Sequence, residues 1–104
     1  MNISMHYLAH FFAGAFLCNC IPHVACALQG SPFQTPFAKP RGVGNSSPLL
    51  NFLWGFFNFV VGLFLLAAFP IATALDPECL PLLLGAFAMG IYLSLHFGKV
   101  RQKP

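Results

Sequence analysis

Four histidines are the residues in this sequence best suited to chemistry: His6, His10, His23 and His96. His6 and His10 are four positions apart and share a face on a helix, whereas His23 and His96 belong to different apolar segments that approach the same expected membrane boundary. Paired imidazoles can bind a metal or supply the axial ligands of a haem. A histidine at a membrane boundary can equally meet only water and headgroups, and this simpler role is the expectation for all four. The default is therefore no metal and no cofactor, with His23 and His96 as the candidate pair for haem or quinone.

The other nucleophilic and acidic side chains form no recognisable catalytic set. Cys18 and Cys20 point about 160° apart on a helix of 3.6 residues per turn, so they do not form a redox or zinc pair. Buried thiols that pack as small apolar groups are the expected role of all the cysteines. Asp76 and Glu78 are the only carboxylates, and they lie together in one short loop. The sequence thus favours a role in binding over a role as an enzyme.

The amount and placement of charge indicate a membrane protein. The chain has 104 residues and is 58% hydrophobic and 7% charged, against about 25% charged residues in soluble domains. A soluble domain this small would expose many of its 13 phenylalanines. The charged residues fall into three clusters, which leave 1–38, 42–75 and 79–98 free of charge. The clusters are Lys39 with Arg41, Asp76 with Glu78, and Lys99 with Arg101 and Lys103.

These stretches predict an all-α membrane protein, a bundle of three transmembrane helices at about 7–28, 49–69 and 79–97, because a bilayer needs about 20 apolar residues per span. Residues 1–104 then form a single transmembrane domain. Pro22 predicts a kink in the first helix, and Pro70 ends the second.

Residues 29–48 form a loop rich in proline and glycine. Two interpretations of this loop are open. It is a segment at the headgroup level, with Phe33 and Phe37 in the interface and Lys39 and Arg41 near anionic lipid, or it is a disordered linker.

The signs of the charges predict the orientation. With three spans, all five Lys and Arg residues lie on one side and both carboxylates on the other. The positive-inside rule then places the C-terminus in the cytoplasm and the N-terminus outside, in a plasma or inner membrane. A rival interpretation makes the first segment a cleaved signal, because 25–27 reads Ala-Cys-Ala. That interpretation lacks a basic N-terminal region and would export the basic residues. Nucleic acid is not an expected partner, since the cations already suit membrane orientation.

Small and amide side chains mark the expected helix-packing faces. Close packing of small residues and interhelical hydrogen bonds drive association in lipid. We expect Asn58 to face the bundle with Asn19 as its partner, and we expect the stripes of the three segments to face one another. The stripes are Asn51, Gly55, Asn58 and Gly62 in the second segment, Ala86, Gly90 and Ser94 in the third, and Ala9 and Ala13 in the first.

Three functional hypotheses follow. The first is an accessory or structural membrane protein, whose partners are the lipid bilayer and other membrane helices or further copies of the chain. The second is a transporter-like unit that oligomerises, with Asn19, Asn51 and Asn58 lining a pathway. The third is a redox protein that binds haem or quinone through His23 and His96. A sealed asparagine stripe favours the first over the second, and an absorption band would identify the third.

Overall fold

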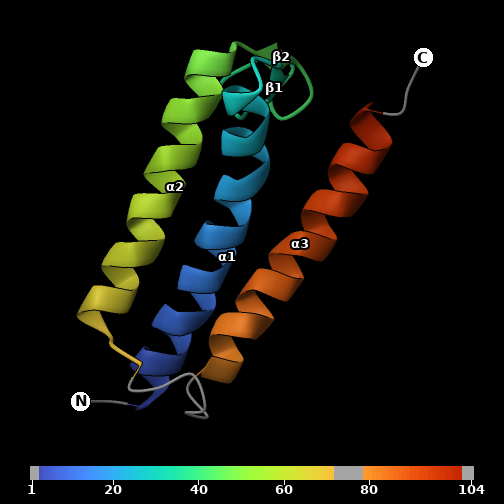
Figure 1. The fold of residues 1–104 in the computed structure, drawn as a ribbon. Helices are drawn as coiled ribbons and strands as arrows, with labels where there is room; N and C mark the ends of the chain where they lie inside the picture. Colours follow the sequence, from blue (N-terminus) through green and yellow to red (C-terminus); the bar gives the residue numbers. More distant parts are fainter. Residues whose placement is uncertain (1–2, 72–78, 102–104) are drawn as a thin grey trace.

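The computed structural model describes residues 3–71 and 79–101 and contains three long helices. They are α1 (Ile3–Leu28), α2 (Pro48–Ala68) and α3 (Cys79–Arg101) (Figure 1). Each is long and apolar enough to cross a membrane. The predicted all-α bundle of three helices is therefore confirmed, and the chain is a small membrane protein. α1 begins before its predicted start and α3 ends beyond Phe97, so both continue past the apolar span.

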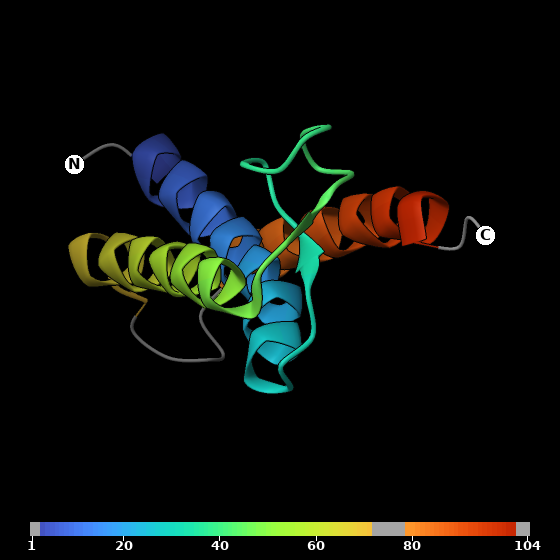
Figure 2. The same ribbon diagram turned by 90° about the horizontal axis from the view of Figure 1, so that it is seen from above.

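The helices are arranged around α1. Both α2 and α3 pack along α1, whereas the described parts of α2 and α3 share almost no contact with each other. Figure 2 shows this arrangement end-on, with α2 and α3 diverging from α1. We call the end that holds the α1–α2 connection and the C-terminal end of α3 the loop end (Figure 1). The bundle is thus open on one side, because only α1 is shared between the two interfaces.

Helix α1 passes through Pro22 without interruption. Both views show it bend in the half that contains this residue, as predicted (Figures 1 and 2). Gly30 ends the helix with a positive φ of 74°. The Ser31 N–H donates to the Cys26 carbonyl at 2.9 Å and the Gly30 N–H to the Ala27 carbonyl at 3.0 Å. This is the Schellman arrangement, which satisfies carbonyls that the helix end would otherwise leave open.

Pro48 is the first residue of α2 and not, as predicted, the last of the loop. Proline suits this position, since it has no N–H to leave unsatisfied and its φ is already helical. Ser47 caps the helix by accepting a hydrogen bond from the Leu50 N–H at 3.2 Å.

The α1–α2 connection has a defined fold, so the prediction of a disordered linker is wrong. Its two ends pair as antiparallel strands β1 (Phe33–Gln34) and β2 (Asn45–Ser46). Strands of two residues are too short to show alternation, so no periodicity in the sequence predicts them. The Thr35 and Ser46 hydroxyls also bond to each other across the ladder, at 2.5 Å.

The two phenylalanines of this connection lie in different environments. Phe33 is 5% exposed and packs edge-on against His23 and Phe97, with centroid distances of 5.3 and 4.5 Å. Phe37 is 59% exposed and packs edge-on against Trp54. The expectation that both rings lie in the interface is therefore wrong for Phe33, which is part of the packed loop end.

The four described basic residues gather at the loop end: Lys39 and Arg41 in the connection, and Lys99 and Arg101 in the last turn of α3. The Arg101 guanidinium donates to Gln34 Oε1 at 3.0 Å and lies 4.6 Å from the centre of the Phe33 ring. These contacts tie the end of α3 to β1. Asp76, Glu78 and Lys103 lie outside the described residues.

Candidate functional site

The α1/α2 seam is the packing interface between these two helices. Asn51, Gly55, Asn58 and Gly62 are the buried residues of α2. A Cβ at Gly55 would lie 2.6 Å from Val24, and one at Gly62 would lie 2.6 Å from Leu17, so both glycines bring α2 close to α1. On α1, Ala9 and Ala13 are buried as well.

The Asn58 side chain is directed into this seam, with 1% of its surface exposed. Asn19 Nδ2 donates to Asn58 Oδ1 at 3.0 Å, which is the pair expected from the sequence. Asn58 Nδ2 in turn donates to the Trp54 carbonyl at 2.8 Å. Both polar groups of Asn58 are therefore satisfied inside the protein, as burial in an apolar surrounding requires.

Asn51 joins α2, α1 and the connection at one point. Its side chain is fully buried, and its Nδ2 lies 3.0–3.1 Å from the carbonyl oxygens of Phe33, Ser46 and Ser47. Because carbonyls only accept, the amide nitrogen must face them, and Oδ1 faces His23 Nδ1 at 2.8 Å. An amide oxygen also only accepts, so His23 carries its proton on Nδ1.

A polar cavity of about 120 Å³ lies at the loop end between α1, the connection and α3. Asn19, His23 and His96 all line it. His96 Nε2 donates to the Gly42 carbonyl at 2.6 Å, which holds the connection against α3. The structure thus brings together the two histidines chosen from the sequence as a candidate pair.

The polar cavity does not fit a haem between His23 and His96. Sites for cofactors typically have volumes of about 300–1,000 Å³, and this cavity is far smaller. No group of three or more possible metal ligands occurs in residues 3–71 and 79–101. The arrangement is suited to hydrogen bonding with a small group.

His10 differs from the expectation of a histidine that meets water or headgroups. It is fully buried, and its Nε2 donates to the Phe69 carbonyl at 2.6 Å. Phe69 is the C-terminal cap of α2. His10 therefore anchors the end of α2 to α1, and this structural role accounts for its burial. His6 lies beside it, with ring centroids 5.8 Å apart.

The α1/α3 seam rests on a close approach of two backbones. A Cβ at Gly85 would lie 1.8 Å from the Phe11 carbonyl oxygen, and one at Gly14 would lie 2.0 Å from the Leu82 carbonyl oxygen. Gly85 is the buried residue of α3. The sequence does not predict these two contacts. Glycine is frequent in membrane helices and does not by itself indicate which face of a helix packs against a neighbour.

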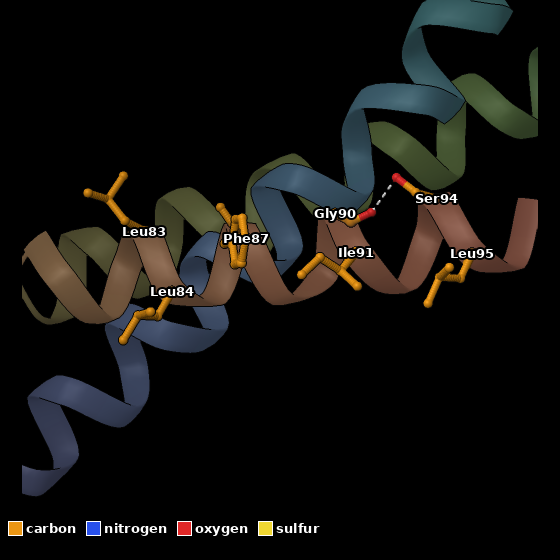
Figure 3. Close-up of a pocket in the computed structure, with 8 residues that line it drawn as sticks. Leu83, Leu84, Phe87, Gly90, Ile91, Ser94 and Leu95 are labelled. Atoms are coloured by element: carbon orange, nitrogen blue, oxygen red, sulfur yellow. Dashed lines mark hydrogen bonds between the residues drawn. The ribbon is translucent and has the colours of Figure 1, made fainter. Parts of the chain in front are cut away.

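The predicted stripe of α3 lies at the edge of this seam, not at its centre. Ala86 is half-buried beside Gly14, a Cβ at Gly90 would lie 3.7 Å from Cys18 Sγ, and Ser94 is exposed. The Ser94 hydroxyl donates to the Gly90 carbonyl of its own helix at 2.7 Å (Figure 3). The expectation that this stripe faces the other two is therefore wrong for Ser94. The packing face is centred one residue earlier, on Gly85.

The outward side of the stripe forms an open, apolar outer groove of about 820 Å³. Figure 3 shows Leu83, Phe87, Ile91 and Leu95 extending from α3 around Gly90. No residue of α1 or α2 lines this groove. The outer groove is thus the part of the predicted helix-packing surface that the chain leaves unfilled.

Cys18, Cys20 and Cys26 are free thiols, and Cys20 is buried with its Sγ donating to the Leu17 carbonyl at 3.0 Å. Comparison with protein-family models, curated proteins and solved structures found no match for this chain.

Proposed function

We propose that this chain is an accessory protein of the plasma or inner membrane that binds a helix of a different membrane protein in the outer groove of α3. In this arrangement the N-terminus is outside and the loop end is cytoplasmic, since the loop end carries the described basic residues. One observation carries the proposal. α3 packs on α1 through Gly85 and leaves the groove around Gly90 open.

The asparagine stripe supports an accessory role over a transporter-like one. A pathway for a polar solute needs polar side chains that water can reach. Asn51 and Asn58 are 0% and 1% exposed, and their amides are bonded to groups of the same chain. The side chains of Asn51 and Asn58 therefore hold the chain together and are not available to line an oligomeric pathway, and Asn19 lines only the small polar cavity. The small polar cavity likewise gives no support to a haem-binding redox protein. We therefore expect the purified protein to be colourless.

The charges at the loop end favour a different protein over a second copy as the occupant. Two copies in the same membrane have the same orientation, so packing α3 against α3 would bring Lys99 and Arg101 of both copies to one end. Like charges at close range oppose association. A partner helix with acidic residues at its cytoplasmic end would gain from the same cations.

Site-specific photo-cross-linking in the native membrane tests this proposal. A photoreactive residue at Ile91, in the outer groove, is expected to give an adduct of one defined mass that differs from twice the chain. The matched position is Phe64 on α2, which is 68% exposed and is expected to give lipid adducts only. Ser94→Phe, at an exposed position that lines the groove, should abolish the protein adduct, whereas Gly98→Leu, at a site with nothing within 4 Å, should not.

Three outcomes would contradict the proposal. They are an adduct of twice the chain mass, which means a second copy; lipid adducts alone at Ile91; and a protein adduct that persists in Ser94→Phe.

A further inference from the structure

A second, apolar groove of about 340 Å³ follows the α1/α3 seam on the other side of α3 from the outer groove. We call it the side groove. Phe12 and Phe16 of α1 and Ala88 of α3 are among the residues that line it. Tyr92 lines both the side groove and the polar cavity. The two spaces therefore border the same residue.

The sequence of α1 shows the same transition from apolar to polar. Phe12, Phe16, Asn19 and His23 are spaced by four, three and four residues, so they form one stripe along the helix. The first two line the side groove, and the last two line the polar cavity. A molecule lying along this stripe would meet phenyl rings over most of its length and hydrogen-bonding groups at one end.

The hydrogen bonds around the cavity run in a fixed direction. Asn58 donates to the Trp54 carbonyl, and Asn19 donates to Asn58. The hydrogen bonds therefore run from Asn19 through Asn58 to the Trp54 carbonyl. Asn19 Oδ1 is the acceptor that remains unused at the other end of this series. This oxygen has no hydrogen-bond partner among the described residues, and an amide oxygen can only accept.

The histidines end two further chains in the same way. Asn51 donates to backbone carbonyls and accepts from His23 Nδ1, which leaves Nε2 of the neutral ring as an acceptor. His96 donates from Nε2 to the Gly42 carbonyl, which leaves Nδ1 as an acceptor. Neither free nitrogen has a partner within residues 3–71 and 79–101. The His23 side chain is only 2% exposed, so its lone pair is not simply hydrated at the surface.

Asn19 Oδ1 and His23 Nε2 need a ligand that donates, whereas Trp54 and Tyr92, which also line the cavity, carry groups that can donate to a ligand. Carboxylate or phosphate heads only accept when ionised, so they do not match. An ammonium head would donate, but it would lie near a positive charge. The Arg101 guanidinium donates to Gln34, which lines the cavity, and like charges repel each other. The remaining class is an uncharged head with hydroxyl groups. At about 30 Å³ per water, the cavity takes a head about as large as glycerol.

We propose that the polar cavity and the side groove together bind a membrane lipid whose head is small, uncharged and hydroxylated. The hydroxyls donate to Asn19 Oδ1 and His23 Nε2, and the chain lies against Phe12 and Phe16. This site is on the opposite side of α3 from the outer groove, so it is independent of the partner helix proposed above.

The single tryptophan reports occupation of this site, because Trp54 lines the polar cavity. The purified chain in detergent is titrated with 1-monooleoylglycerol while Trp54 emission is recorded. A saturable change is expected. The analogue with both hydroxyls replaced by fluorine keeps the chain and nearly the size of the head but cannot donate, and it should bind at least tenfold more weakly. In a second titration, decyl hydroquinone replaces 1-monooleoylglycerol. This second titration distinguishes a lipid whose hydroxyls are on an aromatic ring from a glycerol lipid. Saturable binding of either one supports the proposal.

Two variants separate the contributions of the head and the chain. His23→Leu removes one acceptor and should weaken binding about two- to tenfold, as expected for one neutral hydrogen bond. Ala88→Phe narrows the side groove without touching any hydrogen bond and should weaken binding more. Ala67→Phe is its matched control, because both alanines are exposed on their helices. Since His23 also holds Asn51, the Ala88 variant keeps the test valid if His23→Leu does not fold.

The proposal is overturned if the difluoro analogue binds as tightly as the diol, or if Ala88→Phe behaves like Ala67→Phe. It is also overturned if oleate competes with the diol at equal concentration, because an acceptor head would then suffice.

Discussion

The two seams join α1 to its neighbours by different means. The α1/α2 seam combines glycine contacts with directional bonds, namely Asn19 to Asn58, His23 to Asn51 and His10 to the Phe69 carbonyl. The α1/α3 seam depends on the approach of Gly14 and Gly85 to the opposite backbone. At the loop end, His96 and Arg101 of α3 donate hydrogen bonds to the α1–α2 connection and not to α1. Hydrogen bonds fix one register of α2 on α1, whereas a glycine contact only fixes how near α3 can come. The comparison predicts that substitutions which add bulk at the glycine contacts separate α3 from α1. Substitutions that remove hydrogen-bonding side chains should instead weaken the packing of α2 on α1.

The largest effect is expected from Gly85→Leu. Its Cβ would meet the Phe11 carbonyl oxygen, a backbone atom that cannot turn aside, so α3 should separate from α1 at a cost of about 3 kcal/mol. The reporter is a disulfide between Cys18 and Gly90→Cys, because a Cβ at 90 lies 3.7 Å from Cys18 Sγ. With the other cysteines replaced, oxidation should form this cross-link in the parent and in Gly98→Leu, but not in Gly85→Leu. An unchanged cross-linking rate would show that the α1/α3 contact is not tight.

Asn58→Leu should cost about 2 kcal/mol, because it removes a buried hydrogen bond and leaves the Asn19 amide without its acceptor. Unfolding in mixed micelles measures the loss. A double-mutant cycle with Asn19→Leu isolates the pair, whose expected coupling is roughly 0.6–2 kcal/mol. Strictly additive losses would mean that the two amides do not interact. The Cys18 to Gly90→Cys cross-link should survive, since α3 does not depend on this pair.

Arg101→Met should cost about 1 kcal/mol, since it removes a charged donor to Gln34 and the contact with the Phe33 ring while keeping an apolar side chain. The change should also loosen the loop end, measured as faster amide exchange at residues 33–34. Lys99→Met, at an exposed position in the same turn, is the control and should leave exchange unchanged.

Gly90→Ala should have the smallest effect. The added Cβ makes an ordinary contact at 3.7 Å, and alanine favours the helix by about 0.5–1 kcal/mol. The isolated chain should therefore unfold at the same or slightly higher denaturant concentration. Gly85→Ala, five residues earlier on the same helix, should be strongly destabilised in the same assay, because its Cβ would meet the Phe11 carbonyl oxygen. Equal behaviour of the two alanine variants would remove the distinction between the seam and the outer groove.

Much of the fold followed from the sequence because the membrane imposes strong constraints. The charge-free stretches gave three helices, and Pro22 gave the bend of α1. Asn58 was placed correctly, since an amide in an apolar span must find a partner, and Asn19 lies at a matching depth. His10 was not, because its acceptor is a backbone carbonyl at the end of α2 and carries no signature in the sequence.

The face by which α3 packs was missed by one residue. Gly85 and Ala86 are both small, and 100° of rotation separates them on a helix. Both belong to patterns of small residues, so composition does not decide which one faces α1. The β1–β2 pairing was missed for a related reason. Its order comes from tertiary contacts of Phe33 and Asn51 and not from local periodicity.

The central place of α1 also bears on how the chain assembles as it is made. Of these three helices, α1 is synthesised before the other two, and it carries the docking surfaces for both of them. Each later helix therefore meets a surface that is already in the membrane, so neither has to wait for the other. A ribosome that paused after α2 would leave a two-helix intermediate with its side-chain hydrogen bonds already formed, and α3 could join it as a separate last step.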